Sequence, residues 1–237
     1  MTLPDTTSRE VADVGVILIV RNGERFLADA LSSVIAQTHQ PAEVVVVDGH
    51  STDRTVEIAR SFPNVTVLEQ SGSGIANAYN EGIAHVRCPL LAFISHDDEW
   101  LPQKLELQVK ALAARPDALL AFTHVQHILA GDAPPPGFRA NLLEKPVPGF
   151  IMETLLVRRE AFDRIGMFDP AFAVAEDTDW FARARDAGLT TVVLPQTLVR
   201  KRVHDTNASI SDRGINELLL KALRQSIERK RNAGGAS

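Results

Sequence analysis

The chain has 237 residues, of which 45% are hydrophobic and 23% charged, a composition typical of a globular protein with one substantial domain. Its formal net charge of −5 lacks the concentrated positive charge of nucleic-acid-binding proteins, so no nucleic-acid partner is expected. A single cysteine, Cys88, excludes an intramolecular disulfide and fits a reducing compartment. The polar N-terminus is unlike a signal peptide, and no apolar run there approaches the roughly 20 residues of a membrane-spanning helix. These features predict a cytoplasmic protein.

Short apolar runs alternate with amphipathic segments through the first half of the chain. Four alternations of strand and helix predict βαβ units with right-handed crossovers, and therefore a mainly parallel sheet flanked by helices. Ser51 or Thr52 is the expected cap of the second helix. The predicted strands are 14–20, 44–47, 65–68 and 90–94, and the predicted helices are 24–37, 51–61, 75–86 and 101–114.

The second half is less regular. A Pro-rich loop at 131–148 interrupts it and is a candidate lid or acceptor-binding segment. The basic stretch from Arg224 to Arg231 is expected to be a solvated helix face, with contact to an anionic membrane or a partner as the alternative. Predicted strands are 118–128, 150–157, 191–194 and 198–203, and predicted helices are 159–165, 178–187 and 212–231.

Polar side chains follow three of the predicted parallel strands, at the point where each strand ends. Arg21 and Asn22 follow the first strand, Asp48 ends the second, and His96-Asp97-Asp98 follow the fourth. Ligands of open α/β sheets bind beyond the carboxyl ends of the strands, so we expect these side chains to line one crevice. A single aspartate in such a place is more often a turn or cap residue, but three such places on adjacent strands favour a site.

Adjacent carboxylates at Asp97 and Asp98 repel each other unless a cation lies nearby. A hard divalent ion held by carboxylates and substrate phosphates is one interpretation. The other is a helix N-cap, because Asp98 precedes the helix predicted to begin near Leu101. The residues alone leave both interpretations open.

Several motifs occur together in order along the chain. They are VGVILIVRNGERFLADALSSVIAQT, EVVVVDGHSTDRTVEIA, GIANAYNEGI, LAFISHDDEWLPQKLELQV, TLLVRREAFDRIGMFDPAF, AEDTDWFARARDAG and RVHDTNAS. Over about residues 14–210 the chain resembles glycosyltransferase family 2, whose members have the GT-A fold. The resemblance implies an α/β domain with a Rossmann-like, mainly parallel sheet, a C-terminal acceptor-side region and a C-terminal helix. It also implies an inverting enzyme that transfers a sugar from a nucleotide diphosphate donor to an acceptor hydroxyl or other nucleophile.

Applied to this chain, the resemblance divides it into a tail at 1–13, a nucleotide-sugar-binding half at 14–116, a metal and acceptor half at 117–210, and a helix and tail at 211–237. The resemblance does not identify the acceptor, which could be a glycan, a lipid-linked sugar, a natural product or a peptide. It is also compatible with a homodimer.

The resemblance also assigns catalytic roles. Asp98 would bind the metal, with His204 completing the metal or diphosphate site, and Asp97 would lie near the ribose and the metal. Asp177 would be the general base that takes the proton of the acceptor. Oxygen ligands with one imidazole suit Mn²⁺ or Mg²⁺, and the imidazole favours Mn²⁺. Without the family context, Asp177 is more simply a first-turn acid of the following helix, and His204 could be a solvated strand end.

Further residues are assigned to the substrate by the same resemblance. The segment from Gly74 to Gly82 would pack along the ribose and diphosphate. Trp180 is a candidate sugar contact, with packing in the core as the alternative. The candidate substrate-binding residues are Val20, Arg21, Asp48, Gly74, Asn77, Asp97, Glu176 and Trp180.

The chain departs from the family pattern around the nucleobase. Many members carry Pro-x-Tyr-Asn after the first strand, where this chain has Ile19-Val20-Arg21-Asn22. Many carry two aspartates after the second strand, where Asp48 is followed here by Gly49. Uracil is the family default, but these changes leave the nucleotide open.

Two rival functions are compatible with an α/β fold of this kind. A nucleotidyltransferase also uses metal-binding aspartates, but Arg21-Asn22-Gly23 is a poor version of its Gly-rich phosphate loop. A non-catalytic nucleotide-sugar-binding partner would not need Asp97, Asp98, Asp177 and His204 together.

Overall fold

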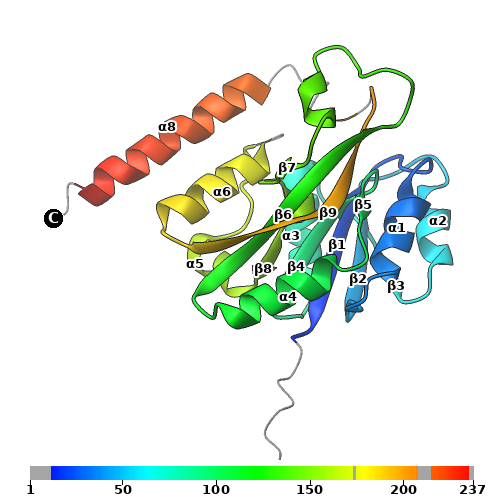
Figure 1. The fold of residues 1–237 in the computed structure, drawn as a ribbon, viewed down its shortest axis with the longest axis horizontal. Helices are drawn as coiled ribbons and strands as arrows, with labels where there is room; N and C mark the ends of the chain where they lie inside the picture. Colours follow the sequence, from blue (N-terminus) through cyan, green and yellow to red (C-terminus); the bar gives the residue numbers. More distant parts are fainter. Residues whose placement is uncertain (1–11, 173–174, 206, 208–214, 235–237) are drawn as a thin grey trace, which may run out of the picture.

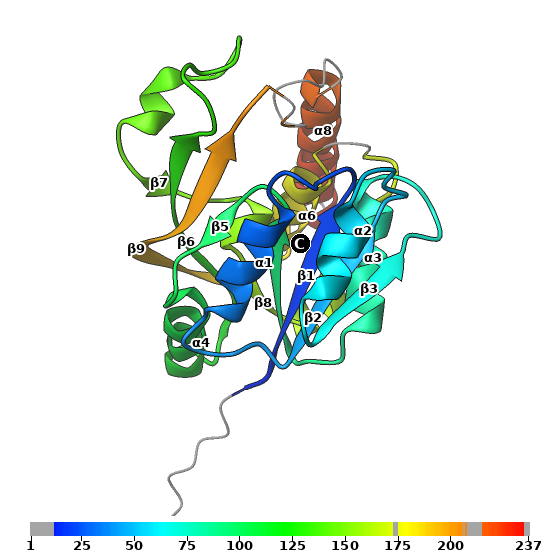
Figure 2. The ribbon, with the colours of Figure 1, turned by 90° about the vertical axis from the view of Figure 1, so that its right-hand side faces the viewer.

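The computed structural model describes residues 12–172, 175–205, 207 and 215–234. Within these residues, one mixed sheet of nine strands has the order β3-β2-β1-β4-β8-β6-β9-β5, with β7 paired to β6. Helices cover both faces of this sheet (Figures 1 and 2). The sheet runs through both halves into which the sequence was divided, and the α/β class is confirmed.

The first half forms the parallel part of the sheet. Strands β1 (Val14–Val20), β2 (Glu43–Asp48), β3 (Val65–Glu69) and β4 (Leu90–Ser95) all pair in parallel. The connecting helices are α1 (Leu27–Ile35), α2 (Thr55–Ser61) and α3 (Ile75–His85). β1, β2 and β4 are almost continuously apolar because helices cover them on both faces, as the sequence predicted.

The second half adds strands of mixed direction. β8 (Leu156–Arg158) is antiparallel to β4 and to β6 (Ala118–Leu129), whereas β9 (Thr190–Val203) is parallel to β6. The short β5 (Glu99–Trp100) pairs antiparallel with β9, and β7 (Val147–Pro148) with β6. The parallel order therefore holds for the first four strands, and the added strands make the sheet mixed.

The remaining helices are α4, α5, α6 and α8, with two 3₁₀ turns, η1 and η2. Their bounds are Lys104–Ala114 for α4, Glu160–Ile165 for α5, Glu176–Asp186 for α6, Ile215–Gly234 for α8, Ala140–Leu143 for η1 and Met152–Thr154 for η2. One apolar layer joins α1, α2 and α4 to the sheet, and the opposite layer joins α3, α5 and α6. Figure 1 shows α8 beside α6 at the periphery.

Two sequence predictions in this half were wrong in detail. The strand predicted at 150–157 is instead the turn η2 followed by β8, because the Thr154 hydroxyl bonds back to the carbonyls of Gly149 and Ile151. The strands predicted at 191–194 and 198–203 are one strand, β9, whose register against β6 shifts around Pro195. Proline is tolerated at such a bulge because no ladder hydrogen bond is required from its nitrogen.

The final helix begins and ends near its predicted bounds, although predicted residues 212–214 lie outside the described residues. Among the helices that the structure describes, none is both long enough and apolar enough to cross a membrane.

Candidate active site

The carboxyl ends of the parallel strands meet at one edge of the sheet. Val20 is in register with Asp48, and Ile19 with Ser95, the last residue of β4. The loops that carry Arg21, Asp48 and His96 to Asp98 therefore start from neighbouring positions. The strand ends are therefore adjacent, as the strand pattern predicted, and that their side chains line one crevice for a ligand stays a prediction.

The loops after β1 and β2 are tied to each other by hydrogen bonds. The Asn22 side chain accepts from the Thr52 amide (2.8 Å), and the Asn22 amide donates to the Ser51 hydroxyl (2.8 Å). Both loops contain a residue with positive φ, Asn22 at 54° and His50 at 61°. The prediction that Ser51 or Thr52 caps α2 was wrong, because these residues hold Asn22 and the helix begins at Thr55.

Asp48 is buried at the end of β2, and one of its carboxylate oxygens has no hydrogen-bond partner among the described residues. Its Oδ2 accepts from the Ser51 amide (3.0 Å), whereas Oδ1 has no hydrogen-bond partner among the described residues. A buried acceptor without a donor is costly, so a donor from a ligand would be favourable here. A cavity of about 390 Å³ lies beside it, lined by Asp48, His50, Ser51, Thr52, Val56, Arg60, Val67 and Glu69.

Asp97 contacts two residues that follow β9. Its Oδ2 lies 2.8 Å from His204 Nε2 and accepts from the Asn207 amide nitrogen at 3.0 Å. The His204 ring also packs on Phe26, at 5.3 Å between ring centroids. Although burial raises it, the pKa of Asp97 is lowered on balance by the positive charge of Lys201 and by the nearby imidazoles.

Asp98 is fully buried, and its carboxylate accepts hydrogen bonds from a different set of groups than that of Asp97. Its Oδ1 accepts from the Arg202 amide (2.8 Å) and its Oδ2 from Lys201 Nζ (3.0 Å). Burial raises the pKa of Asp98 to about 8, and the Glu153 and Asp97 carboxylates add to this against the Lys201 charge. Asp98 was predicted to bind the metal, with His204 completing the site. In the structure Asp97, not Asp98, lies within contact of His204, and the metal assignment itself stays a prediction. The side chain of Asp98 instead anchors β9 to the loop after β4.

Glu153, on η2, completes this buried ionic cluster. Its Oε1 accepts from the Ser95 hydroxyl (2.6 Å) and from Lys201 Nζ (3.1 Å). Although burial lowers it, the pKa of Lys201 is held well above its usual range by Asp98 and Glu153. Sequence reasoning missed Glu153 and Lys201. Glu153 lies 48 residues from Lys201 in the sequence, and no local pattern pairs them.

Glu176 and Asp177 form the first turn of α6, two residues earlier than predicted. The preceding Ala175 has φ of 67°, a strained value for a residue with a Cβ. Asp177 Oδ1 accepts from the Thr178 amide (2.6 Å) and hydroxyl (3.2 Å). Burial raises the pKa of Asp177, with a further contribution from Glu153, and burial beside Asp177 raises that of Glu176 to about 8.

The remaining predicted substrate residues lie in different environments. Val20 is buried at the end of β1 and Arg21 is exposed after it. Gly74 precedes α3 with φ of 87°, and the Asn77 amide nitrogen donates to the Ser73 carbonyl (2.7 Å). The prediction of a substrate contact for Trp180 was wrong. Its ring is fully buried against Phe162 and Phe168, and its Nε1 donates to the Gly166 carbonyl (3.0 Å).

Few side chains near the strand ends could act as ligands for a metal ion. No group of three or more His, Cys, Asp or Glu residues suited to a metal ion occurs in the part of the chain that the structure describes. Asp97 and His204 supply one carboxylate and one imidazole within contact of each other. Mg²⁺ and related ions often take one or two protein ligands and complete their shell with substrate phosphates and water. The pair therefore fits an ion that arrives with a diphosphate.

The chain resembles known proteins along most of its length. A family model described as glycosyl transferase family 2 matches residues 15–168, more than half of the chain. An uncharacterised glycosyltransferase of Rickettsia typhi is 27% identical over 220 residues, covering 86% of this chain and 68% of the relative. A putative teichuronic acid biosynthesis glycosyltransferase of Bacillus subtilis, TuaG, is 31% identical over 107 residues, covering 43% of this chain and 42% of that protein.

Among solved structures, residues 1–349 of TarS from S. aureus in complex with UDP-GlcNAc superpose with a TM-score of 0.71 at 17% identity. The match covers 92% of this chain and 66% of that chain. At this level of identity the likeness establishes a common fold, and it agrees with the GT-A architecture expected from the sequence.

Proposed function

The chain belongs to glycosyl transferase family 2 and is a sugar-transferring enzyme, and we propose that it uses a nucleoside diphosphate sugar with inversion at the anomeric carbon. The observation that carries this proposal is the crevice itself. One edge of the sheet brings together a buried carboxylate with a free acceptor oxygen at Asp48 and a carboxylate–imidazole pair at Asp97 and His204. We assign the nucleoside to the ends of the first two strands and the diphosphate to the loop after the fourth, where ligands of open α/β sheets bind.

Asp48 is proposed to bind the nucleobase. Its Oδ1 is buried and lacks a partner among the described residues, and Asp48 lines the neighbouring cavity, so a small rotation of the carboxylate would let it accept a hydrogen bond from a base N–H. The similar fold of TarS holds UDP-GlcNAc, which supports a uridine donor for this chain as well. Arg21 replaces the aromatic residue found in many members, and its exposed guanidinium could stack on the base or bind a phosphate.

Asp97 and His204 are proposed to hold Mn²⁺ or Mg²⁺ together with the donor diphosphate. When bound, the ion would neutralise charge that develops on the departing diphosphate. We place the ion on Asp97 rather than on Asp98 because Asp97 lies against His204, whereas Asp98 points toward Lys201 and the Arg202 amide. Its proposed role is to fix the loop that presents Asp97.

Asp177 is proposed as the general base. It is partly exposed at the start of α6, and a raised pKa makes its carboxylate a better proton acceptor than an ordinary aspartate. Attack by the deprotonated acceptor oxygen opposite the leaving diphosphate forms the new glycosidic bond, breaks the donor bond and inverts the anomeric carbon. The acceptor stays among the classes expected from the sequence.

The deciding experiment is an analysis of the products released from UDP-, GDP- and dTDP-sugars, with Mn²⁺ and with chelator. We expect a nucleoside diphosphate from a UDP-sugar in the presence of the ion, by slow transfer to water when no acceptor is added. Release of pyrophosphate from a nucleoside triphosphate and a sugar phosphate would indicate a nucleotidyltransferase instead. Donor binding without turnover in the presence of a broad acceptor panel would favour the non-catalytic partner.

A further inference from the structure

Exposed apolar side chains are concentrated on α8. Of the seven large apolar side chains that are exposed in the described part of the chain, four lie on this helix. They are Leu219, Leu220, Leu223 and Ile227, and we call them the α8 outer face. With about 3.6 residues per turn, positions 220, 223 and 227 form one stripe along the helix, with 219 at its border.

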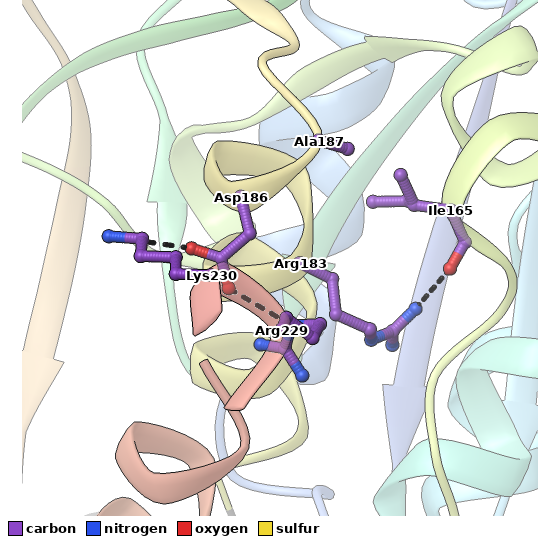
Figure 3. Close-up of a pocket in the computed structure, with 6 residues that line it drawn as sticks. All are labelled: Ile165, Arg183, Asp186, Ala187, Arg229 and Lys230. Atoms are coloured by element: carbon purple, nitrogen blue, oxygen red, sulfur yellow. Dashed lines mark hydrogen bonds and ion pairs between the residues drawn. The ribbon is translucent and has the colours of Figure 1, made fainter. Parts of the chain in front are cut away.

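The opposite side of α8 is packed on α6. Ala222 and Ser226 are buried there, and the Ser226 hydroxyl donates to Asp186 Oδ1 (3.0 Å). Figure 3 shows Arg229 and Lys230 of α8 converging on Asp186 of α6, with Arg229 Nε at 3.0 Å from Oδ2, at a cavity of about 390 Å³. These contacts fix the rotation of α8, so the outer face points away from α6 instead of toward the core.

The outer face has a basic border. Arg224 and Arg231 lie beside the apolar stripe on the helix surface, both exposed, and neither contacts a carboxylate among the described residues. On the same helix Glu228 lies one turn from both arginines, but it is farther from the apolar stripe than they are, and within the described residues of α8 it forms no ion pair with either. Of the five cations in residues 221–231, Arg229 and Lys230 pair with Asp186 and Lys221 contacts Phe172, which leaves Arg224 and Arg231 for the outer face. An apolar stripe with a cationic border is the pattern of helices that lie in a membrane interface.

We propose that α8 docks this chain on an anionic bilayer, with the outer face inserted among the lipids and Arg224 and Arg231 on the headgroup phosphates. Charge complementarity favours lipid over a second copy of the chain. A two-fold contact between copies applies the same patch to itself and would bring two basic borders together. This inference concerns binding alone and is independent of the proposed transfer reaction.

The test is co-sedimentation of the full chain with vesicles of phosphatidylcholine, and with vesicles of equal phosphatidylcholine and phosphatidylglycerol. We expect binding to the mixed vesicles only, weakened at high ionic strength because the charges are exposed. Leu223→Ser with Ile227→Ser should lower the partition coefficient at least about tenfold through lost apolar burial. Arg224→Gln with Arg231→Gln should lower it about fivefold for each charge removed.

Val193→Ser is the matched control, since Val193 is an exposed aliphatic residue on β9 rather than on α8, and its loss should leave binding unchanged. Thermal unfolding checks that each variant folds, and the arginine pair tests the idea without altering any packed residue. Protein that stays in the supernatant with both vesicles, or binds both equally, overturns the proposal. A dimer in light scattering that the serine pair converts to a monomer, with unchanged vesicle binding, would assign the outer face to a second copy.

Discussion

Asp97 and Asp98 are adjacent in the sequence, but their carboxylates have different partners. Asp97 faces His204 and Asn207 at the crevice, whereas Asp98 points into the protein toward Lys201. Consecutive residues leaving a strand point in opposite directions, so one carboxylate can serve a ligand while the other serves the fold. The same substitution at the two positions should therefore have different consequences.

We expect Asp97→Ala to abolish most metal-stimulated transfer and to destabilise the fold less than Asp98→Ala, because Asp97 is bonded to His204 and Asn207 at the edge of the sheet and not to the buried Lys201. Asp98→Ala should lower the free energy of unfolding by on the order of 3 kcal/mol, because it removes one partner of a buried ion pair. Metal titration calorimetry and denaturant unfolding separate the two effects. Loss of metal binding in folded Asp98→Ala, with normal binding in Asp97→Ala, would reverse the assignment.

The proposed base is tested at the same scale. Asp177→Asn should keep donor affinity and reduce transfer by roughly 10²–10⁴, the usual contribution of a positioned base. Glu176→Gln should be milder, because successive residues at a helix start point in different directions and Glu176 is the more buried of the two. Donor binding and turnover are measured separately for both variants. A greater loss in Glu176→Gln would move the base by one residue.

At the scale of elements, the start of α6 concentrates two carboxyl groups behind a left-handed alanine. Ala175 at φ of 67° turns the chain so that α6 begins with Glu176 and Asp177. Such backbone values cost about 1–3 kcal/mol and persist where surrounding structure imposes them. The helix N-terminus partly offsets the repulsion between the two acids.

This arrangement predicts a pH-dependent stability. The pKa of Glu176 rises from an ordinary value near 4.5 to about 8 in the folded chain, so the folded state holds a proton that the unfolded chain releases. Stability from Glu176 is present below about pH 4.5 and is lost as the pH rises toward about 8. The glutamine of Glu176→Gln stays neutral at every pH. The free energy of unfolding of this variant relative to wild type should therefore rise from pH 5 to pH 8, by roughly 1.4 kcal/mol per unit of pKa shift at most. Thermal unfolding at the two pH values measures the difference. An equal difference at both pH values would contradict a raised pKa.

At the scale of the whole molecule, the proposed sites for base, diphosphate and acceptor proton come from different parts of one sheet and its helices. A donor that bridges β2, the loop after β4 and the end of β9 would bind only the folded state. Binding of this kind adds to the free energy of unfolding by an amount set by the ratio of ligand concentration to Kd, about 2.7 kcal/mol at a hundredfold excess, and so raises the melting temperature. We expect a UDP-sugar with Mn²⁺ to raise the melting temperature, and we expect chelator to remove most of this increase. A full gain in the presence of chelator would argue against a role for the ion in donor binding.

The sequence by itself determined the order of the elements and the edge where the site lies. Alternating apolar runs are a local property, so β1 to β4 and α1 to α4 could be placed within a few residues. The resemblance to glycosyltransferase family 2 singled out Asp97, Asp98, Asp177 and His204, with Asp98 rather than Asp97 as the metal ligand. The cytoplasmic location and the metal stay predictions.

Only the tertiary structure decided which carboxylate meets His204, where Trp180 points, and that Glu153 and Lys201 share a buried cluster. Asp97 and His204 are 107 residues apart, and their contact depends on how β9 lies against the loop after β4. Trp180 follows Asp177 by less than one helical turn, yet packing of α6 on α5 turns its ring into the core. Periodicity specifies which face of an element is apolar, but the register and twist between distant elements determine which side chains touch.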